Sequence, residues 1–276
     1  MKTSYLIFSL LLYSLTGFPQ IDSLKKSKQD AIVEKYLKRG AYKYHYLLQG
    51  WQDWIDKGLV QDSTIAYLWE MKAMPYWKTK KYEIALVYFN KAVQYDRKRN
   101  LARRGFYKCI FQKNYKEALI DLNQAENEFG YSFQSDHSLS FYKSLCYLQL
   151  NQFSKAKEIL EFDVQKTISS RGEIAIHYLD QFYLGIISLE LQDFDLAIEN
   201  FNKSISQYSQ FSDAKYYKGL CLLKQGKLKE AQEIMIEAQS DFNNKNSINE
   251  DDSFYEDFPY KVNWYMAKWV MPKSKL

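Results

Sequence analysis

A spacing of 34 residues recurs along this chain, and no other feature of the sequence constrains its fold as much. Four residues are each matched 34 positions later, namely Trp51, Ile55, Gly58 and Asp62 by Ala85, Phe89, Ala92 and Asp96. Successive alanines then follow at spacings of 33, 38, 41 and 34, through Ala85, Ala118, Ala156, Ala197 and Ala231. Apolar residues three and four positions apart line one face of a helix, and a small residue there lets a second helix approach closely. The repeats therefore predict stacked pairs of helices, each stable only when its neighbours cover it.

Aromatic residues keep the same register as these alanines. One stands three residues before the alanine of four units, as Tyr82, Tyr115, Phe153 and Phe194. An aromatic pair also precedes each of the last four units, as Phe106-Tyr107, Phe141-Tyr142, Phe182-Tyr183 and Tyr216-Tyr217. The register predicts six hairpins, at 32–65, 66–98, 99–131, 137–170, 178–211 and 212–245. Loops at 126–136 and 165–177 would carry the insertions, with Gly130 and Gly172 as turn residues.

This pattern resembles the tetratricopeptide repeat, in which Trp, Leu-Gly, Tyr, Ala, Phe and Ala follow one another over about 34 residues. The match is best over residues 66–98 and 178–245 and covers about 32–245. The proline that usually closes each repeat is missing, because Ser63 and Arg97 occupy those positions in the first two units. The resemblance implies an all-α fold, a right-handed α-α superhelix of about six hairpins. The chain is also similar to exported repeat proteins of Gram-negative bacteria that have no assigned activity.

The first 19 residues have the features of a secretory signal peptide. Lys2 supplies a basic start, and the apolar run from Tyr5 to Leu15 is about half of the roughly 20 residues that a membrane-spanning helix needs. No cysteine lies near the expected cleavage region, so attachment to a lipid is not indicated. The alternative is a buried helix or an uncleaved anchor. We expect an exported protein, periplasmic or secreted, that is soluble after cleavage.

Residues 246–276 follow the last predicted hairpin and differ from the repeats. The first part is a polar, acidic linker that extends to residue 258, and a helix is predicted from Pro259 to Met271. Its apolar residues are Val262, Trp264, Tyr265, Trp269 and Val270. The last hairpin has no further repeat to cover its outward face, which by register includes Leu228 and Met235. We expect the C-terminal helix to cap this face, and binding of the helix to a membrane surface is the alternative.

The basic residues indicate which partners to expect, and the cysteines indicate whether disulfides form. Only six of the 38 basic residues are arginine, a composition that disfavours nucleic acid as a partner. Five basic residues lie within 97–104, which suits either an acidic partner or a solvated turn between repeats. The three cysteines belong to different repeats and are expected to be buried free thiols.

Residues that could carry chemistry are few. The sequence contains no phosphate-binding glycine loop, nucleophile elbow or metalloprotease motif, and its three histidines are not spaced for a metal. His137 and His177 instead suit capping or solvent-facing roles, and Glu70 and Glu190 do not converge by register. We therefore expect no enzymatic activity and no cofactor. The alternatives are a helical enzyme or a glycan-binding protein acting on polysaccharide or cell-wall material.

The resemblance implies that a groove lined by the first helix of each repeat binds a protein or peptide partner. The positions implied are Tyr67, Glu70, Met74, Trp77, Arg103, Tyr107, Phe111, Phe141, Phe182 and Tyr216. They lack the Lys and Asn of the carboxylate clamp found in chaperone-binding members, so that specificity is not supported. An aromatic, apolar groove instead suits an amphipathic helix or an extended hydrophobic peptide. Some of these rings could equally belong to the core, because a shift of one residue turns a groove position inward.

Overall fold

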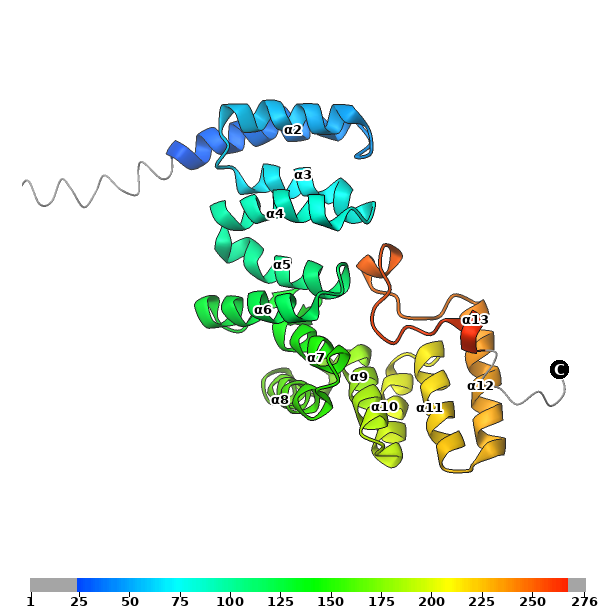
Figure 1. The fold of residues 1–276 in the computed structure, drawn as a ribbon. Helices are drawn as coiled ribbons and strands as arrows, with labels where there is room; N and C mark the ends of the chain where they lie inside the picture. Colours follow the sequence, from blue (N-terminus) through cyan, green and yellow to red (C-terminus); the bar gives the residue numbers. More distant parts are fainter. Residues whose placement is uncertain (1–23, 268–276) are drawn as a thin grey trace, which may run out of the picture. The chain divides into compact units, whose positions relative to one another are not determined.

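A computed structural model describes residues 24–267 of the chain, so the predicted signal peptide lies outside the described residues. The chain divides into two compact units, residues 1–100 and 101–276, and each is described here by itself. Nearly all of the regular structure is helical (Figure 1), which confirms the all-α prediction. Among the described helices, none is long and apolar enough to cross a membrane.

The first unit is made of two helical hairpins. Residues 24–32 are α-helical and continue into the π-helical turns η1 (Val33–Lys38), which η2 (Ala41–Lys43) and α2 (Gln49–Gln61) follow. The second hairpin consists of α3 (Ala66–Lys78) and α4 (Tyr82–Tyr95). The fully buried residues Leu37, Ile55 and Leu68 join the first hairpin to α3 in one core.

Helix α5 (Arg97–Ile110) crosses the boundary between the two units. The basic run 97–104, predicted as a turn between repeats, forms its first two turns, so that prediction is wrong. Asp96 explains where the helix begins, because its side chain accepts a 3.1 Å hydrogen bond from the backbone N–H of Arg99, as a helix-capping residue does.

In the second unit, the end of α5 packs against α6 (Tyr115–Phe129), where a Cβ atom added to Gly105 would lie 2.8 Å from Leu122, and further helix pairs follow along the described chain. Helix α6 packs on α7 (Leu139–Gln149), and the two short strands β1 (Phe133–Gln134) and β2 (His137–Ser138) pair antiparallel between them. The remaining hairpins are α7 with α8 (Phe153–Arg171), α9 (Tyr178–Glu190) with α10 (Phe194–Gln207), and α11 (Ser212–Lys224) with α12 (Leu228–Asn243). Shorter elements are η3 (Glu173–Ala175), η4 (Asp251–Phe254) and α13 (Trp264–Ala267).

Small residues lie at the helix contacts, as the repeat pattern predicted. Ala118, Ala156, Ala197 and Ala231 are all completely buried. A Cβ atom added to Gly185 on α9 would lie 2.6 Å from the ring of Phe201 on α10, so these two helices approach as closely as glycine allows. The three cysteines are free and buried, which confirms their predicted state.

The two insertions are partly helical. Gly130 and Gly172 end α6 and α8 with φ of 83° and 81°, which confirms them as turn residues. The predicted loop 165–177 is wrong over its first half, however, because α8 continues to Arg171. Its buried Val164 and Thr167 extend the packed face of the helix beyond the ordinary repeat length.

The C-terminal residues differ from the predicted helix. Residues 258–263 are not helical, and Tyr260 has a φ of 61°, which a residue other than glycine seldom adopts. Trp264 packs against Tyr216 and Phe242 of the last hairpin, as expected of a segment that covers it. The predicted cover of Leu228 is wrong, because this side chain is 64% exposed. Trp269 and Val270 lie outside the described residues.

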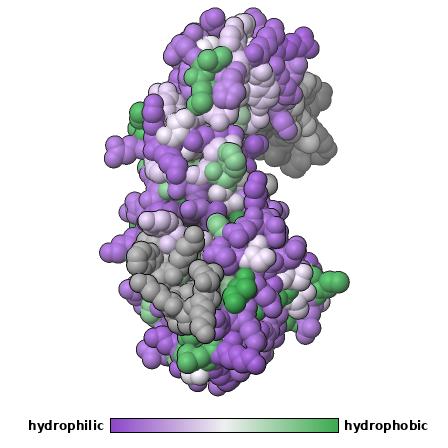
Figure 2. Space-filling view, turned by 90° about the vertical axis from the view of Figure 1, so that its right-hand side faces the viewer, coloured by the Kyte–Doolittle hydropathy of each residue, from purple (hydrophilic) through white to green (hydrophobic). Residues whose placement is uncertain are grey.

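Hydrophobic atoms are scattered over the visible surface. The face in Figure 2 is mainly hydrophilic, and its hydrophobic residues lie in small separate areas. The most exposed large side chains, Ile174 at 97% and Phe254 at 87%, are single residues on different segments. An open, continuous apolar groove is therefore not visible on this face.

Candidate functional site

The first helices of the hairpins in the second unit are buried on nearly all sides. All residues of α7 from Leu139 to Leu148 are buried, as are all residues of α9 from Gln181 to Ser188. A surface helix normally exposes one face to water. Here the second helices of the hairpins pack on one side, and the C-terminal segment contacts α9, α11 and His137, just before α7, on another (Figure 1). We call residues 246–264 the tail, and the surface of α7, α9 and α11 that it covers the groove.

Asp213, at the start of α11, holds two parts of the tail at once. Its Oδ1 accepts a 2.7 Å hydrogen bond from the backbone N–H of Val262. Its Oδ2 accepts from the hydroxyl of Ser247 at 2.7 Å and from the backbone N–H of Ile248 at 3.2 Å. Burial raises the pKa of this carboxyl above its ordinary value, although these hydrogen bonds favour the ionised form. The tail thus leaves the last hairpin and returns to it at a single carboxylate.

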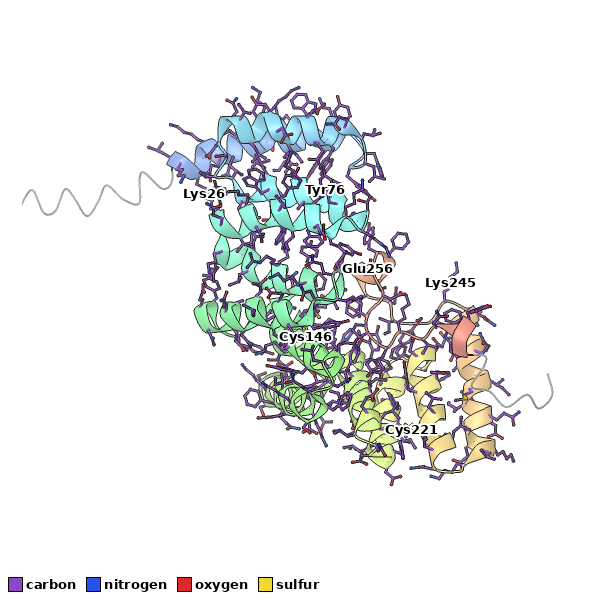
Figure 3. All side chains as sticks on the ribbon, viewed as in Figure 1. Lys26, Tyr76, Cys146, Cys221, Lys245 and Glu256 are labelled. Atoms are coloured by element: carbon purple, nitrogen blue, oxygen red, sulfur yellow. The ribbon has the colours of Figure 1, made fainter. Side chains whose placement is uncertain are left out.

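Between these two points the tail runs along the groove and is bound through its backbone. The buried hydroxyl of Tyr183 donates a 2.8 Å hydrogen bond to the carbonyl oxygen of Pro259. Lys113, which follows α5, donates from its ammonium group to the carbonyl oxygen of Asp257. Figure 3 labels Lys245, just after α12, and Glu256, in the part of the tail that lies farthest from α12. Contacts to backbone atoms depend on the path of the segment's backbone more than on a particular sequence.

Side chains of the tail add a second set of contacts. The hydroxyl of Tyr260 donates a 2.7 Å hydrogen bond to Glu190 at the end of α9, and its ring packs against Tyr217. Glu190 was expected not to converge with other acidic residues, and it lies here as an acceptor for the tail. Burial, followed by the nearby Glu190, raises the pKa of the Tyr260 hydroxyl, so it stays protonated and can donate.

Two histidines and a tail glutamate meet at the middle of the tail. His137 lies in β2 just before α7, His177 is the N-cap residue of α9, and Glu250 belongs to the tail. The Nε2 atom of His137 lies 3.2 Å from Oε2 of Glu250, and the two imidazole rings are 4.8 Å apart between centroids. One ligand atom from each of the three residues lies within 4.8 Å of the other two. The capping role expected of His177 is confirmed, since its Nδ1 accepts from the backbone N–H of Leu179.

Burial and neighbouring charges shift the pKa values of His177 and Glu250. Burial, followed by the proximity of His137, lowers the pKa of His177 and so favours a neutral imidazole. Burial would raise the pKa of Glu250, but the hydrogen bond and charge of His137 outweigh it and hold that pKa below its ordinary value. An ionised carboxylate therefore faces two imidazoles in a mostly buried position.

The groove positions implied in the first unit are only partly open. Tyr67 and Met74 are half-buried, whereas Glu70 and Trp77 are buried. Glu70 forms an ion pair with Arg99 at 3.0 Å, and the guanidinium of Arg99 lies 5.2 Å from the ring centroid of Tyr67. This part of the first unit is an aromatic surface with a paired charge rather than an apolar channel.

The groove positions implied in the second unit are mostly inside the protein. Phe111, Phe141 and Phe182 are 3%, 0% and 0% exposed, so none of these rings is open to a partner. Tyr216 is nearly buried beneath Trp264 of the tail, and Arg103 and Tyr107 remain half-buried. The repeat pattern placed Tyr183 in an aromatic pair but did not predict its contact with the tail, and it did not single out Asp213 or Glu250, because these contacts join the tail to the repeats and not one repeat to the next.

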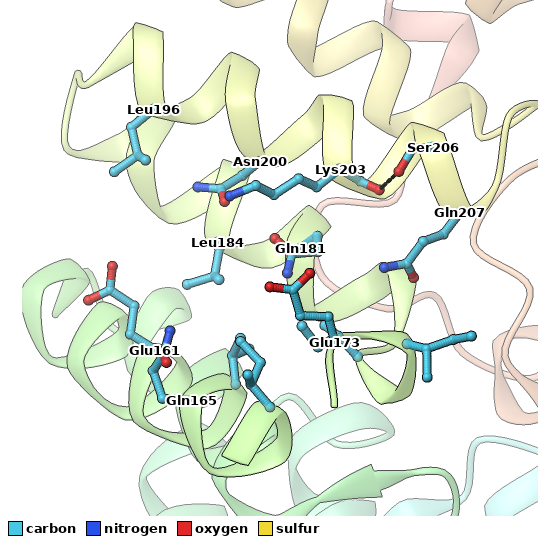
Figure 4. A pocket seen from close by; sticks show the side chains of 14 residues that line it. Glu161, Gln165, Glu173, Gln181, Leu184, Leu196, Asn200, Lys203, Ser206 and Gln207 are labelled. Carbon is cyan, nitrogen blue, oxygen red and sulfur yellow. Dashed lines mark hydrogen bonds between the residues drawn. The ribbon is translucent and has the colours of Figure 1, made fainter. Parts of the chain in front are cut away.

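A pocket of about 640 Å³ lies between α8, η3, α9 and α10, apart from the tail contacts (Figure 4). Its polar side chains include Glu161, Glu173, Gln181, Asn200 and Lys203. None of the fourteen residues lining it is aromatic, histidine or cysteine. The pocket therefore offers no aromatic ring on which a sugar could stack.

Comparisons with known proteins agree with the fold. The family model of the tetratricopeptide repeat matches residues 66–99. PilW, a widely conserved type IV pilus biogenesis factor, is 15% identical with a TM-score of 0.58, over 80% of this chain and 94% of its own. A tetratricopeptide repeat protein from Parabacteroides merdae is 14% identical with a TM-score of 0.60, over 78% and 80% of the two chains. MamA from Desulfovibrio magneticus RS-1 is 16% identical with a TM-score of 0.54, over 66% and 97%.

A search of curated proteins finds no match to this sequence. At these identities the solved structures establish the fold alone. The resemblance to the tetratricopeptide repeat that the sequence predicted is confirmed, as is its superhelical arrangement of helical hairpins.

Proposed function

We propose that this protein is a non-catalytic scaffold of the cell envelope whose groove binds a peptide segment of a partner protein. The tail carries this proposal, because it is a largely irregular peptide segment already bound in the groove, in part through its backbone. Tyr183 and Lys113 donate hydrogen bonds to its backbone carbonyl groups, and Asp213 accepts hydrogen bonds from its backbone N–H groups. A partner segment of similar shape could use the same donors and acceptors once the tail leaves.

The comparisons support a role in protein interaction. Tetratricopeptide repeats generally present their first helices to a protein or peptide, and the present groove is formed by α7, α9 and α11. The location in the cell envelope rests on the first 19 residues alone, through Lys2 and the apolar run that follows it.

Binding can be tested with the tail sequence itself as the probe. A fluorescent peptide of residues 246–267 is added to the wild-type chain and to Val262→Pro, which removes the N–H that Asp213 accepts. We expect the variant to bind the peptide more tightly than wild type does, because its own tail competes less well. Adding Tyr183→Phe to that variant should weaken binding, since the carbonyl of Pro259 then loses its donor.

Two results would contradict the proposal. Equal peptide binding by wild type and Val262→Pro would show that the groove is not freed by loosening the tail. A full-length protein recovered from the cytoplasm with Met1 intact would contradict the envelope location, which cell fractionation and N-terminal sequencing measure directly.

A further inference from the structure

We propose that His137, His177 and Glu250 bind a divalent transition-metal ion of the zinc class, which ties the tail to the groove. The three residues come from three segments that the fold brings together: β2, the start of α9, and the tail. This inference stands apart from the proposed peptide binding, because it concerns the tail in its docked position.

The donor set matches the chemistry of such an ion. Imidazole nitrogen and carboxylate oxygen are ligands of Zn²⁺ and of the neighbouring first-row divalent ions, and two histidines with one glutamate form a known zinc set. Donors around a tetrahedral zinc ion are about 3.3 Å apart, as follows from bonds of about 2.0–2.1 Å. The His137 and Glu250 atoms are 3.2 Å apart, and all three donor atoms lie within 4.8 Å of one another. Closing around an ion therefore needs only a small side-chain movement.

The surroundings favour a cation and allow it to enter. His137 is only 2% exposed, whereas His177 and Glu250 are half-buried and leave a path from solvent. Asp180, next to the cluster, accepts a hydrogen bond from the backbone N–H of His177 and adds a further negative charge. The Leu179 bond to Nδ1 of His177 is long, at 3.4 Å, so a metal could displace it at small cost. Three protein ligands leave one position of a tetrahedral ion to water.

The ion would join parts of the chain that are far apart in sequence. His137 and Glu250 are separated by 113 residues, so the bond closes a long loop of the chain. A ligand that binds only the docked state stabilises that state in proportion to its occupancy. Metal availability would therefore control how firmly the tail occupies the groove.

The experiment titrates metal-stripped full-length protein with Zn²⁺ in a calorimeter and compares it with three variants. His177→Gln and Glu250→Gln each remove one ligand, and both should bind roughly 100-fold more weakly or not at all. His45→Gln is the matched control, because His45 belongs to the first unit and is the remaining histidine of the chain. Wild type and this control should both bind a single ion per chain with equal affinity. Circular dichroism of the metal-free proteins verifies that each variant is folded.

Hydrogen exchange of residues 247–262 supplies the second measurement. Zn²⁺ should slow exchange there in wild type and in His45→Gln, but not in His177→Gln. The site is refuted if wild type does not bind Zn²⁺ or if all four proteins bind it equally, as they would at unrelated surface groups. Binding that leaves the exchange of the tail unchanged would refute the tether.

Discussion

The backbone N–H of Val262 donates a 2.7 Å hydrogen bond to the fully buried carboxylate of Asp213, across 49 residues of sequence. The same carboxylate also accepts from Ser247 and from the backbone N–H of Ile248. A loop of the tail thus starts and ends at one side chain of α11. Removal of the Asp213 carboxylate should therefore affect the tail more than any other single substitution.

Replacing Asp213 with alanine should lower the free energy of unfolding by about 2–4 kcal/mol, because buried N–H groups of the tail lose their acceptor. Urea denaturation measures this loss, and limited proteolysis should show cleavage within 246–263. Glu233→Ala is the control, because Glu233 is an exposed residue of α12 and its loss should cost no more than about 0.5 kcal/mol. An unchanged stability of Asp213→Ala would mean that the tail is not anchored there.

Replacing Ala197 with tryptophan should lower the free energy of unfolding by about 1–3 kcal/mol or more, because the fully buried methyl group faces a packed helix. Lys203→Ala on the same helix serves as the comparison, since Lys203 is exposed and its 2.7 Å ion pair with Glu199 lies on the surface. Thermal unfolding measures both variants. Equal melting temperatures would show that the repeat register is wrong.

Deleting residues 259–276 should lower the melting temperature and increase binding of a hydrophobic dye. The deletion removes the acceptor of the buried Tyr183 hydroxyl and exposes the ring of Tyr216 beneath Trp264. Phe254→Ala changes an 87% exposed residue of the tail and should leave both readings unchanged. A truncated chain that melts like wild type and stays monomeric would show that the tail is a docking element for a partner and no part of the core.

Lys215 on α11 should stabilise the last hairpin at neutral pH and lose this effect at alkaline pH. Its ammonium group lies 2.6 Å from Asp241 and 3.3 Å from Glu237 on α12, and these carboxylates raise its pKa although burial opposes the shift. Because the pKa is raised in the folded protein, the stabilisation is complete below the ordinary lysine value and is lost as pH rises through the raised one. The stability difference between wild type and Lys215→Met should therefore be constant near neutral pH and shrink above about pH 10.5. A difference that does not change at alkaline pH would contradict this assignment.

The helical core was predictable because its contacts are local in sequence. Ala156 and Ala197 pack against the preceding helix of their own hairpin, so the pattern of one repeat is enough to place them. The sequence pattern failed at the tail, because contacts with distant residues determine its structure. The residues just before Trp264 were predicted to be helical and are not. Their polar backbone groups bond instead to Asp213 and Tyr183.

The candidate site was not predictable in the same way. His137 and His177 are 40 residues apart and His137 and Glu250 are 113 apart, so no spacing rule connects them. The rings of Phe141 and Phe182 fit the groove register but are buried, because they pack against rings of neighbouring helices: Phe141 against Tyr183, and Phe182 against Phe201 and Tyr217. A pattern read within one repeat cannot show what another segment will cover.

The hydrogen bond from Lys113 to Asp257 joins residues that are 144 positions apart in sequence, so it can form only after both have been synthesised. Hairpins that contact only their neighbours can fold as they are made, one after another. A bond between distant residues must instead wait for both and requires closure of a long loop, which slows folding. Helices α7 and α9 are therefore synthesised early but completed late, and they present an uncovered apolar side until the last residues of the tail arrive. During this interval, the uncovered apolar side chains are most open to aggregation.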